Sequence, residues 1–166
     1  MNIDVIPDIT MRGQDDPHGR SVTPCQPTVG QLAARLRDLA SRPADWWHLI
    51  AFDQRESRRV RLAGSSKVAE LWLITWPPGY RTDVHDHPDT EVSTVSTVIA
   101  GELVEVTMSA AGWSAGADWP GILGVAERPL RANRIQVHGG GHTRELHNPG
   151  PAYAITLHAN PASASE

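Results

Sequence analysis

The first regular pattern of apolar positions predicts a short helix. Three leucines recur at helical spacing and fall on one face: Leu32, Leu36 and Leu39. Thr28 precedes them, and Gln31 three residues later completes a capping box at the start of a helix. Pro43 disfavours helical geometry at the residue before it, so we expect the helix to end at 41–43. A further short turn capped by Asp45 is expected to carry two tryptophans.

From about residue 57 the pattern changes to short β-rich runs that alternate with Gly and Pro turns. The expected strands are 57–62, 68–76, 83–87, 91–100, 102–108, 112–118, 134–138, 142–147 and 153–159. The run 68–76 is almost continuously apolar, which indicates a central position in a sheet. Many short strands with tight turns and no long helix between them are typical of a sandwich or barrel. We therefore predict an all-β fold with a short N-terminal helical segment.

The length of 166 residues fits one domain with a single core. We expect residues 1–27 to form an extended or partly disordered arm, because Pro, Asp, Gly and Ser are frequent there and no apolar period persists. Residues 28–161 form the expected domain, with the helix at its start. Residues 162–166 form an expected disordered tail.

Composition narrows the classes of function. The formal net charge is -4, without the basic field that nucleic-acid binding needs. No run of about 18 apolar residues is present, so we expect no membrane span, and the N-terminus has no signal-peptide pattern. Cys25 is the only cysteine, which excludes an intramolecular disulfide and fits a reducing cytoplasm. These features favour a cytoplasmic protein that acts on a small molecule.

The main chemical signal is a pair of histidines separated by one residue. His85 and His87 lie in the expected strand 83–87, where residues i and i+2 point to the same face. Two imidazoles can therefore converge on one metal ion, while Asp86 points the other way. Imidazole suits iron, zinc, copper and nickel alike, so the pair by itself does not choose the metal. A polar edge strand would show the same pattern.

The residues around this pair match a known motif. Gly79 lies six residues before His85, and Glu91 lies four residues after His87, which matches the first cupin motif. Further matching segments are the run Leu-Trp-Leu-Ile-Thr-Trp-Pro-Pro-Gly at 71–79, Thr82, and the segments 100–105, 148–150 and 154–158. Over roughly residues 45–161, the chain resembles the cysteine dioxygenase family.

This resemblance implies a cupin jelly-roll β-barrel that binds ferrous iron through three histidines. It also implies an activity, in which both atoms of O2 are added to a small thiol, cysteine or a related compound, to give a sulfinate. The expected cofactor is Fe(II), with zinc or nickel as other metals that such a site accepts. The expected partners are the thiol and O2, and we expect a monomer or a homodimer.

The third metal ligand departs from the family pattern. The family places a histidine four residues before the asparagine that is Asn148 here, and that position is Arg144. An arginine side chain stays protonated and is not a ligand. His142 lies two residues earlier on the same strand face, so we expect His142 to join the histidine pair as the third ligand. Two alternatives stay open: Glu91 is the third ligand, or the site is lost and Arg144 occupies the metal position.

The closing strand departs as well. Where the family carries Ser, His and Tyr at alternating positions, this chain has Thr156, His158 and Asn160. The resemblance implies that Thr156 and His158 form an inward, hydrogen-bonded pair with a catalytic role, while the tyrosine hydroxyl is absent. The Cys–Tyr crosslink of the family cannot form, because the corresponding region carries Val92.

Substrate binding is expected to use arginine. The family holds the substrate carboxylate with an arginine on an early strand, and Arg59 occupies roughly that place, with Arg61 on the same face as a reserve. A guanidinium group suits a carboxylate by bidentate hydrogen bonding. A solvated strand edge would give the same sequence pattern. If Arg144 points inward, it could bind an acidic group of the substrate beside the metal.

The leading hypothesis is therefore a non-haem iron thiol dioxygenase. Two alternatives remain: a cupin metalloenzyme of other chemistry, and a non-catalytic cupin that binds a small ligand and has a degenerate metal site. The second alternative follows from the missing histidine and tyrosine. A measurement of metal binding would distinguish the non-catalytic cupin from the thiol dioxygenase and from a cupin metalloenzyme of other chemistry.

Overall fold

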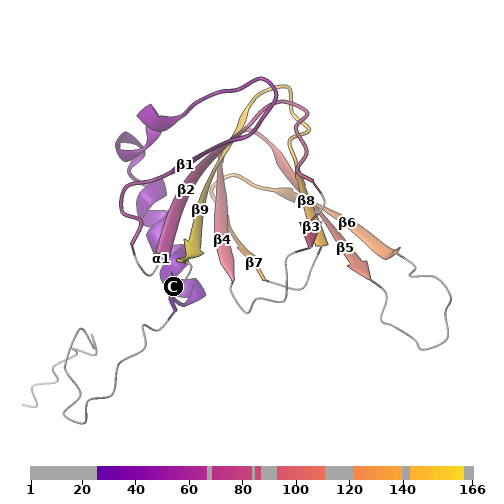
Figure 1. Cartoon of the computed structure of the whole chain (residues 1–166), viewed down its shortest axis with the longest axis horizontal. Coiled ribbons are helices and arrows are strands. Elements are labelled where there is room, and N and C mark those ends of the chain that lie inside the picture. The colour runs from indigo at the N-terminus through magenta and orange to yellow at the C-terminus, as the bar shows by residue number, and fades with distance from the viewer. Residues whose placement is uncertain are drawn as a thin grey trace, which may run out of the picture.

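The structure is a computed structural model that describes residues 26–66, 69–83, 85–86, 93–110, 122–139 and 143–162. In this part of the chain one α-helix precedes nine β-strands, which form two antiparallel sheets rather than one continuous hydrogen-bonded barrel. Helix α1 covers the outer side of one sheet, and the second sheet lies on the other side (Figure 1). The predicted all-β fold with a short N-terminal helical segment is confirmed.

Strands from distant parts of the chain lie side by side in both sheets. The five-stranded sheet has the order β1 (Arg58–Arg61), β2 (Ala69–Trp76), β9 (Ala154–Pro161), β4 (Thr94–Ala100) and β7 (Ile135–His138). The four-stranded sheet has the order β3 (His85–Asp86), β8 (Thr143–His147), β5 (Leu103–Ala110) and β6 (Ile122–Leu130). Strand β2 has a neighbour on each side, as its apolar sequence predicts. Because β9 pairs with both β2 and β4, the end of the chain closes this sheet.

Strand β6 is the one described strand that the sequence pattern did not predict. Its nine residues contain Gly124 and Pro129, two residue types that are depleted in strands. Among the described strands it pairs with β5 alone and forms an edge of its sheet, where a missing backbone N–H is tolerated. The expected strand 112–118 lies outside the described residues.

Helix α1 (Val29–Ala40) begins and ends where the sequence predicts. The Thr28 hydroxyl accepts a hydrogen bond from the Gln31 backbone N–H at 3.2 Å, and the Gln31 side chain accepts from the Thr28 N–H at 2.9 Å, which completes the capping box. Two 3-10 turns follow, η1 (Pro43–Asp45) and η2 (Trp47–Leu49). No helix in the described part of the chain is both long and apolar enough to cross a bilayer.

The core lies between α1 and the outer face of the five-stranded sheet. The three leucines of the predicted helix face are almost fully buried there. Alternate residues of β9 pack against them: Ile155, Leu157 and Ala159. The intervening residues of β9 point to the inner face, toward the second sheet. A second, smaller apolar cluster lies on that inner face, around Trp76 and Leu103.

One buried asparagine joins two turns that are far apart in the sequence. The Asn148 side-chain amide contacts the carbonyl oxygens of Trp76, Pro77 and Ala152 at 2.9–3.0 Å, and its side-chain oxygen accepts from the Gly150 N–H at 3.0 Å. Buried amide groups need such partners, and this one is fully engaged. The Pro-Pro-Gly turn after β2 and the Asn-Pro-Gly turn before β9, both noted in the sequence, are thus held together.

Candidate functional site

A cavity of about 220 Å³ lies between the inner faces of the two sheets. Its described lining residues come from both sheets and the adjoining segments: Arg59, Ile74, Trp76, Thr82, Thr94, Arg144, Leu146, His158 and Asn160. None of these nine residues is acidic, and two of them carry a guanidinium group. Three of the predicted site residues, Arg59, Arg144 and His158, are therefore brought together in one place.

The inner face of β9 supplies an ordered hydrogen-bonded chain to this cavity. The Trp76 indole N–H donates to the Thr156 hydroxyl at 2.8 Å, and that hydroxyl lies 2.8 Å from His158 Nε2. His158 Nδ1 has no hydrogen-bond partner among the described residues. The inward pair that the resemblance implied is present, and its catalytic role stays a prediction. The sequence did not show that Trp76 completes the chain.

His158 is neutral over the physiological pH range. Burial lowers its pKa to about 3, and the positive charges of His138, Arg59 and Arg144 act in the same direction. A neutral imidazole presents one N–H and one lone pair to its surroundings. Since Nε2 is engaged with Thr156, Nδ1 is the ring nitrogen that remains for a ligand in the cavity.

The two early-strand arginines have different surroundings. The Arg59 guanidinium carbon lies 3.9 Å from the centroid of the Trp72 ring, which positions its charge by a cation–π contact at the cavity wall. Arg61 pairs with Glu70 at 3.1 Å, and its side chain is half exposed. Arg59 is therefore the one that reaches the cavity. Its role in binding a carboxylate stays a prediction.

The expected metal position lies where β3 meets β8. The register of this pair places His85 directly opposite Arg144 along the backbone. The Arg144 side chain is 16% exposed and lines the cavity, which confirms that it points inward. Its guanidinium has no lone pair to offer a metal. Burial lowers the pKa of Arg144, and the charge of Glu105 opposes that shift.

The described residues do not complete a metal site. Among the described residues, no three His, Cys, Asp or Glu side chains gather around one point. The predicted ligands His87 and His142, together with the alternative ligand Glu91 and the crosslink position Val92, lie outside the described residues. The choice among the alternatives for the third ligand therefore remains a prediction.

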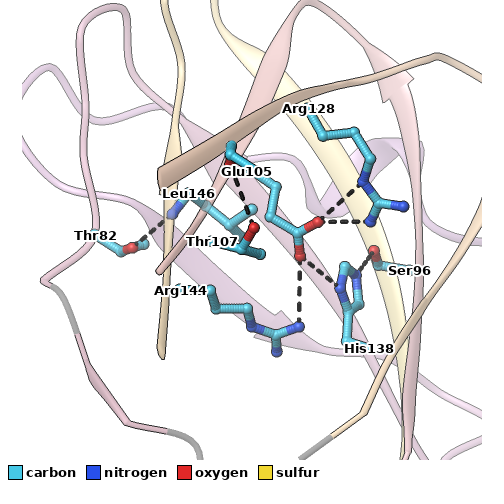
Figure 2. Close-up of polar contacts among 9 residues, drawn as sticks. Thr82, Ser96, Glu105, Thr107, Arg128, His138, Arg144 and Leu146 are labelled. Atoms are coloured by element: carbon cyan, nitrogen blue, oxygen red, sulfur yellow. Dashed lines mark hydrogen bonds and ion pairs between the residues drawn. The ribbon is translucent and has the colours of Figure 1, made fainter. Parts of the chain in front are cut away.

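A buried carboxylate behind Arg144 organises a second polar cluster (Figure 2). Glu105 lies 3.0 Å from His138 Nδ1, 3.1 Å from Arg128 Nε and 3.8 Å from an Arg144 guanidinium nitrogen. His138 Nε2 lies 2.7 Å from the Ser96 hydroxyl. The hydrogen bond from His138 holds the pKa of Glu105 at about 2 although burial opposes it, and Arg128 contributes as well. Glu105 is thus charged, and it attracts the guanidinium group of Arg144 from a position outside the cavity lining.

The sequence analysis did not select this cluster. A signal was nevertheless present, because Glu105 shares a strand face with Leu103, which is buried inside the fold. A carboxylate at an inward position requires charged or hydrogen-bonding partners. Its partners come from β6, β7 and β8, and their identity depends on strand pairing that sequence patterns did not reveal.

Comparisons with known proteins agree with this fold. The cysteine dioxygenase type I family matches residues 28–147 of this chain. The cysteine dioxygenase type 1 proteins of Rattus norvegicus and Mus musculus are each 29% identical to it over 112 residues, which are 64% of this chain and 50% of each relative. The chain thus spans about half the length of the curated relatives that it matches.

Solved structures support the fold alone. A structure of oxalate oxidase matches with a TM-score of 0.50 and 17% identity, covering 69% of this chain and 56% of that chain. The family match and the two antiparallel sheets confirm the predicted cupin fold class. The chain belongs to the cysteine dioxygenase type I family.

Proposed function

We propose that this protein is a non-haem iron thiol dioxygenase that converts a small thiol and O2 into a sulfinate. The observation that carries the proposal is the cavity lined by Arg59, His158 and Arg144, in which His158 is hydrogen-bonded to Thr156 and the strand of Arg144 pairs with the strand of His85. Membership in the cysteine dioxygenase type I family supports the reaction class. The reaction balances without a further reductant, since oxidation of the sulfur supplies all the electrons that O2 accepts.

We assign the metal to His85, His87 and His142. Fe(II), when bound, would acidify the thiol and activate O2 at neutral pH. Zinc and nickel are metals that the same donors accept. The cytoplasm as location and a monomer or homodimer as assembly also remain predictions.

The residues that line the cavity would bind the substrate and exclude water. Arg59 binds the substrate carboxylate, because its guanidinium is already positioned over Trp72. Neutral His158 hydrogen-bonds the bound substrate through Nδ1, and Thr156 fixes the ring from the other side. Ile74 and Leu146 line the same cavity and exclude water from the reacting groups.

The test joins metal analysis to O2 consumption. Protein loaded anaerobically with Fe(II) should bind the metal near one equivalent and consume O2 with a small thiol, with the sulfinate identified by mass. His85→Ala should lose the metal and the activity, whereas His48→Ala, which changes an exposed side chain on η2, should keep both. Bound iron without O2 uptake on cysteine, 3-mercaptopropionate or a related thiol would refute the thiol chemistry and favour another cupin metalloenzyme.

One observation favours a second candidate function. Arg144 lies opposite His85 and carries a positive charge toward the position that a cation would occupy. A non-catalytic cupin that binds a small anionic ligand would have the same arrangement. Protein that takes up neither Fe(II) nor Zn(II) but binds small carboxylates would support this candidate.

A further inference from the structure

We propose that Asn160 and Thr94 form a binding position for a hydroxyl group of the ligand, and that the substrate is a small thiol bearing one carboxylate and one hydroxyl. The choice of a thiol rests on the proposed function, whereas the hydroxyl position rests on the cavity itself. Nothing in the thiol dioxygenase reaction requires this hydroxyl. The inference comes from two neighbouring uncharged side chains that line the cavity without partners of their own.

The strand register places Asn160 and Thr94 side by side on the inner face of the five-stranded sheet. Strands β4 and β9 are antiparallel, and their register aligns Val95 with Ala159. The next pair along these strands is Thr94 and Asn160. Both residues line the cavity, as does His158, which lies two positions before Asn160 on the same face. The two side chains therefore border the space that holds the substrate.

The protein itself does not use these two polar groups. Within the described ranges, neither the Asn160 amide nor the Thr94 hydroxyl has a hydrogen-bond partner. Both residues are partly buried, and polar groups in such positions normally have a partner. Their donors and acceptors are therefore available to a ligand in the cavity.

The ionisable groups beside this pair are already engaged. Glu70 lies opposite Asn160 on β2, and Arg61 forms an ion pair with it at 3.1 Å. On the other side of the pair, His138 is hydrogen-bonded to Glu105 at 3.0 Å. These contacts leave Asn160 with an uncharged surrounding, which favours an uncharged polar group of the ligand over a charged one.

The chemistry of the two side chains selects a hydroxyl. The Asn160 amide offers donors and an acceptor, and the Thr94 hydroxyl offers one donor and accepts as well. A ligand hydroxyl also donates and accepts, so it satisfies a group of each kind. An ammonium group has no acceptor for the Asn160 NH2 group, and it would lie near the positive charge of Arg59. Arg59 is left to bind the carboxylate of the same ligand.

The first measurement is calorimetric titration of the full chain with 2-hydroxybutyrate, 2-methylbutyrate and 2-aminobutyrate. These acids carry a hydroxyl, a methyl or an ammonium group at one position, and none contains a thiol. The hydroxy acid should bind about two- to tenfold tighter than the methyl analogue, which is the factor that one uncharged hydrogen bond supplies. It should also bind tighter than the amino analogue.

Variants assign this preference to the pair. Asn160→Leu, which keeps a side chain of similar size and removes the amide, should abolish the preference for the hydroxy acid. It should leave the affinity for 2-methylbutyrate within about twofold, because that ligand makes no such hydrogen bond. Thr94→Val should reduce the preference. Gln54→Leu, which changes an exposed amide outside the cavity, should keep it.

Retained binding of 2-methylbutyrate shows that the Asn160→Leu variant is folded. If that variant does not fold, Asn160→Ala serves in its place, because it also removes the amide. Equal affinity for the hydroxy and methyl acids, tighter binding of the amino acid, no binding of any of the three, or a preference that survives the loss of the Asn160 amide would overturn the inference.

The second measurement separates this inference from the proposed function. O2 uptake by iron-loaded protein is compared for 2-hydroxy-3-mercaptopropionate and 3-mercaptopropionate, which differ by one hydroxyl. If both proposals hold, Asn160→Leu should raise the KM for the hydroxy thiol, while kcat and the KM for 3-mercaptopropionate change by less than about twofold. Asn160-dependent binding of 2-hydroxybutyrate without O2 uptake on either thiol supports the hydroxyl position and refutes the thiol chemistry. Uptake with equal KM values for the two thiols supports the thiol chemistry and overturns the hydroxyl position.

Discussion

The two faces of strand β9 have opposite characters although they alternate along the same eight residues. On the outer face, Leu157 and Ala159 are fully buried under helix α1. On the inner face, Thr156 and His158 are joined by a hydrogen bond, and His158 lines a cavity together with Arg59 and Arg144. The comparison separates two tasks, because the outer face stabilises the fold by apolar burial and the inner face forms the site.

The largest effect is expected on the outer face. Leu157→Ala removes a fully buried side chain beneath α1 and should lower the free energy of unfolding by about 2–5 kcal/mol. Asn160→Ala, on the inner face of the same strand, should change it by no more than about 0.5 kcal/mol. Urea unfolding monitored by tryptophan fluorescence measures both. Equal losses of unfolding free energy in the two variants would show that the outer face does not contribute more to stability than the inner face.

The next effect concerns the carboxylate behind the cavity. Glu105→Gln removes the charge that Arg128 and His138 bind, and it should lower the free energy of unfolding by about 1.5–3 kcal/mol. Glu127→Gln, on the exposed part of β6, is the matched control and should be close to neutral. If the two variants have the same stability, the cluster around Glu105 does not stabilise the inner face.

Acid should destabilise the protein through the inner face. The pKa of His158 falls from 6.5 to about 3 on folding, so the unfolded chain binds a proton between these values that the folded chain does not. The contribution of neutral His158 to the free energy of unfolding is therefore fully present above pH 6.5. It falls as the pH drops, by about 2 kcal/mol between pH 7 and pH 5. The carboxyl of Glu105, with its pKa lowered from 4.5 to about 2, adds a loss of the same sign below pH 4.5.

Unfolding by urea at pH 5 and pH 7 tests this prediction. His158→Gln should lose most of the difference between the two pH values, whereas His48→Gln should keep it. A variant at position 158 that retains the full difference would show that another group causes it.

The smallest effect is expected from the arginine that does not reach the cavity. Arg61→Gln removes a half-exposed ion pair with Glu70, and it should change the free energy of unfolding by less than about 1 kcal/mol. It should also leave the KM for a thiol that carries a carboxylate unchanged, whereas Arg59→Gln should raise that KM. If Arg61→Gln and Arg59→Gln had equal effects on this KM, the cavity position of Arg59 would not distinguish it from Arg61.

Patterns within a few residues of sequence predicted those features that depend on residues close to one another in the chain. The capping box of α1 depends on residues three positions apart, and the inward placement of Thr156 and His158 depends on strand alternation. Strand β6 was not predicted because a proline such as Pro129 is tolerated in a strand mainly at a sheet edge, and edge position is a property of the whole sheet. The same holds for Glu105, whose partners lie on three other strands.

The sequence by itself determined the all-β class, the helix boundaries, the family resemblance and the departure at Arg144, since each follows from spacing along the chain. Only the tertiary structure decided that Arg59 rather than Arg61 reaches the cavity, that Arg144 points into it, and that Glu105 supports Arg144 from behind. The physical reason is that these choices depend on which strands pair. Strand pairing and the packing of the two sheets bring together residues far apart in the sequence, such as Glu105 with Arg144 and Arg59 with Arg144.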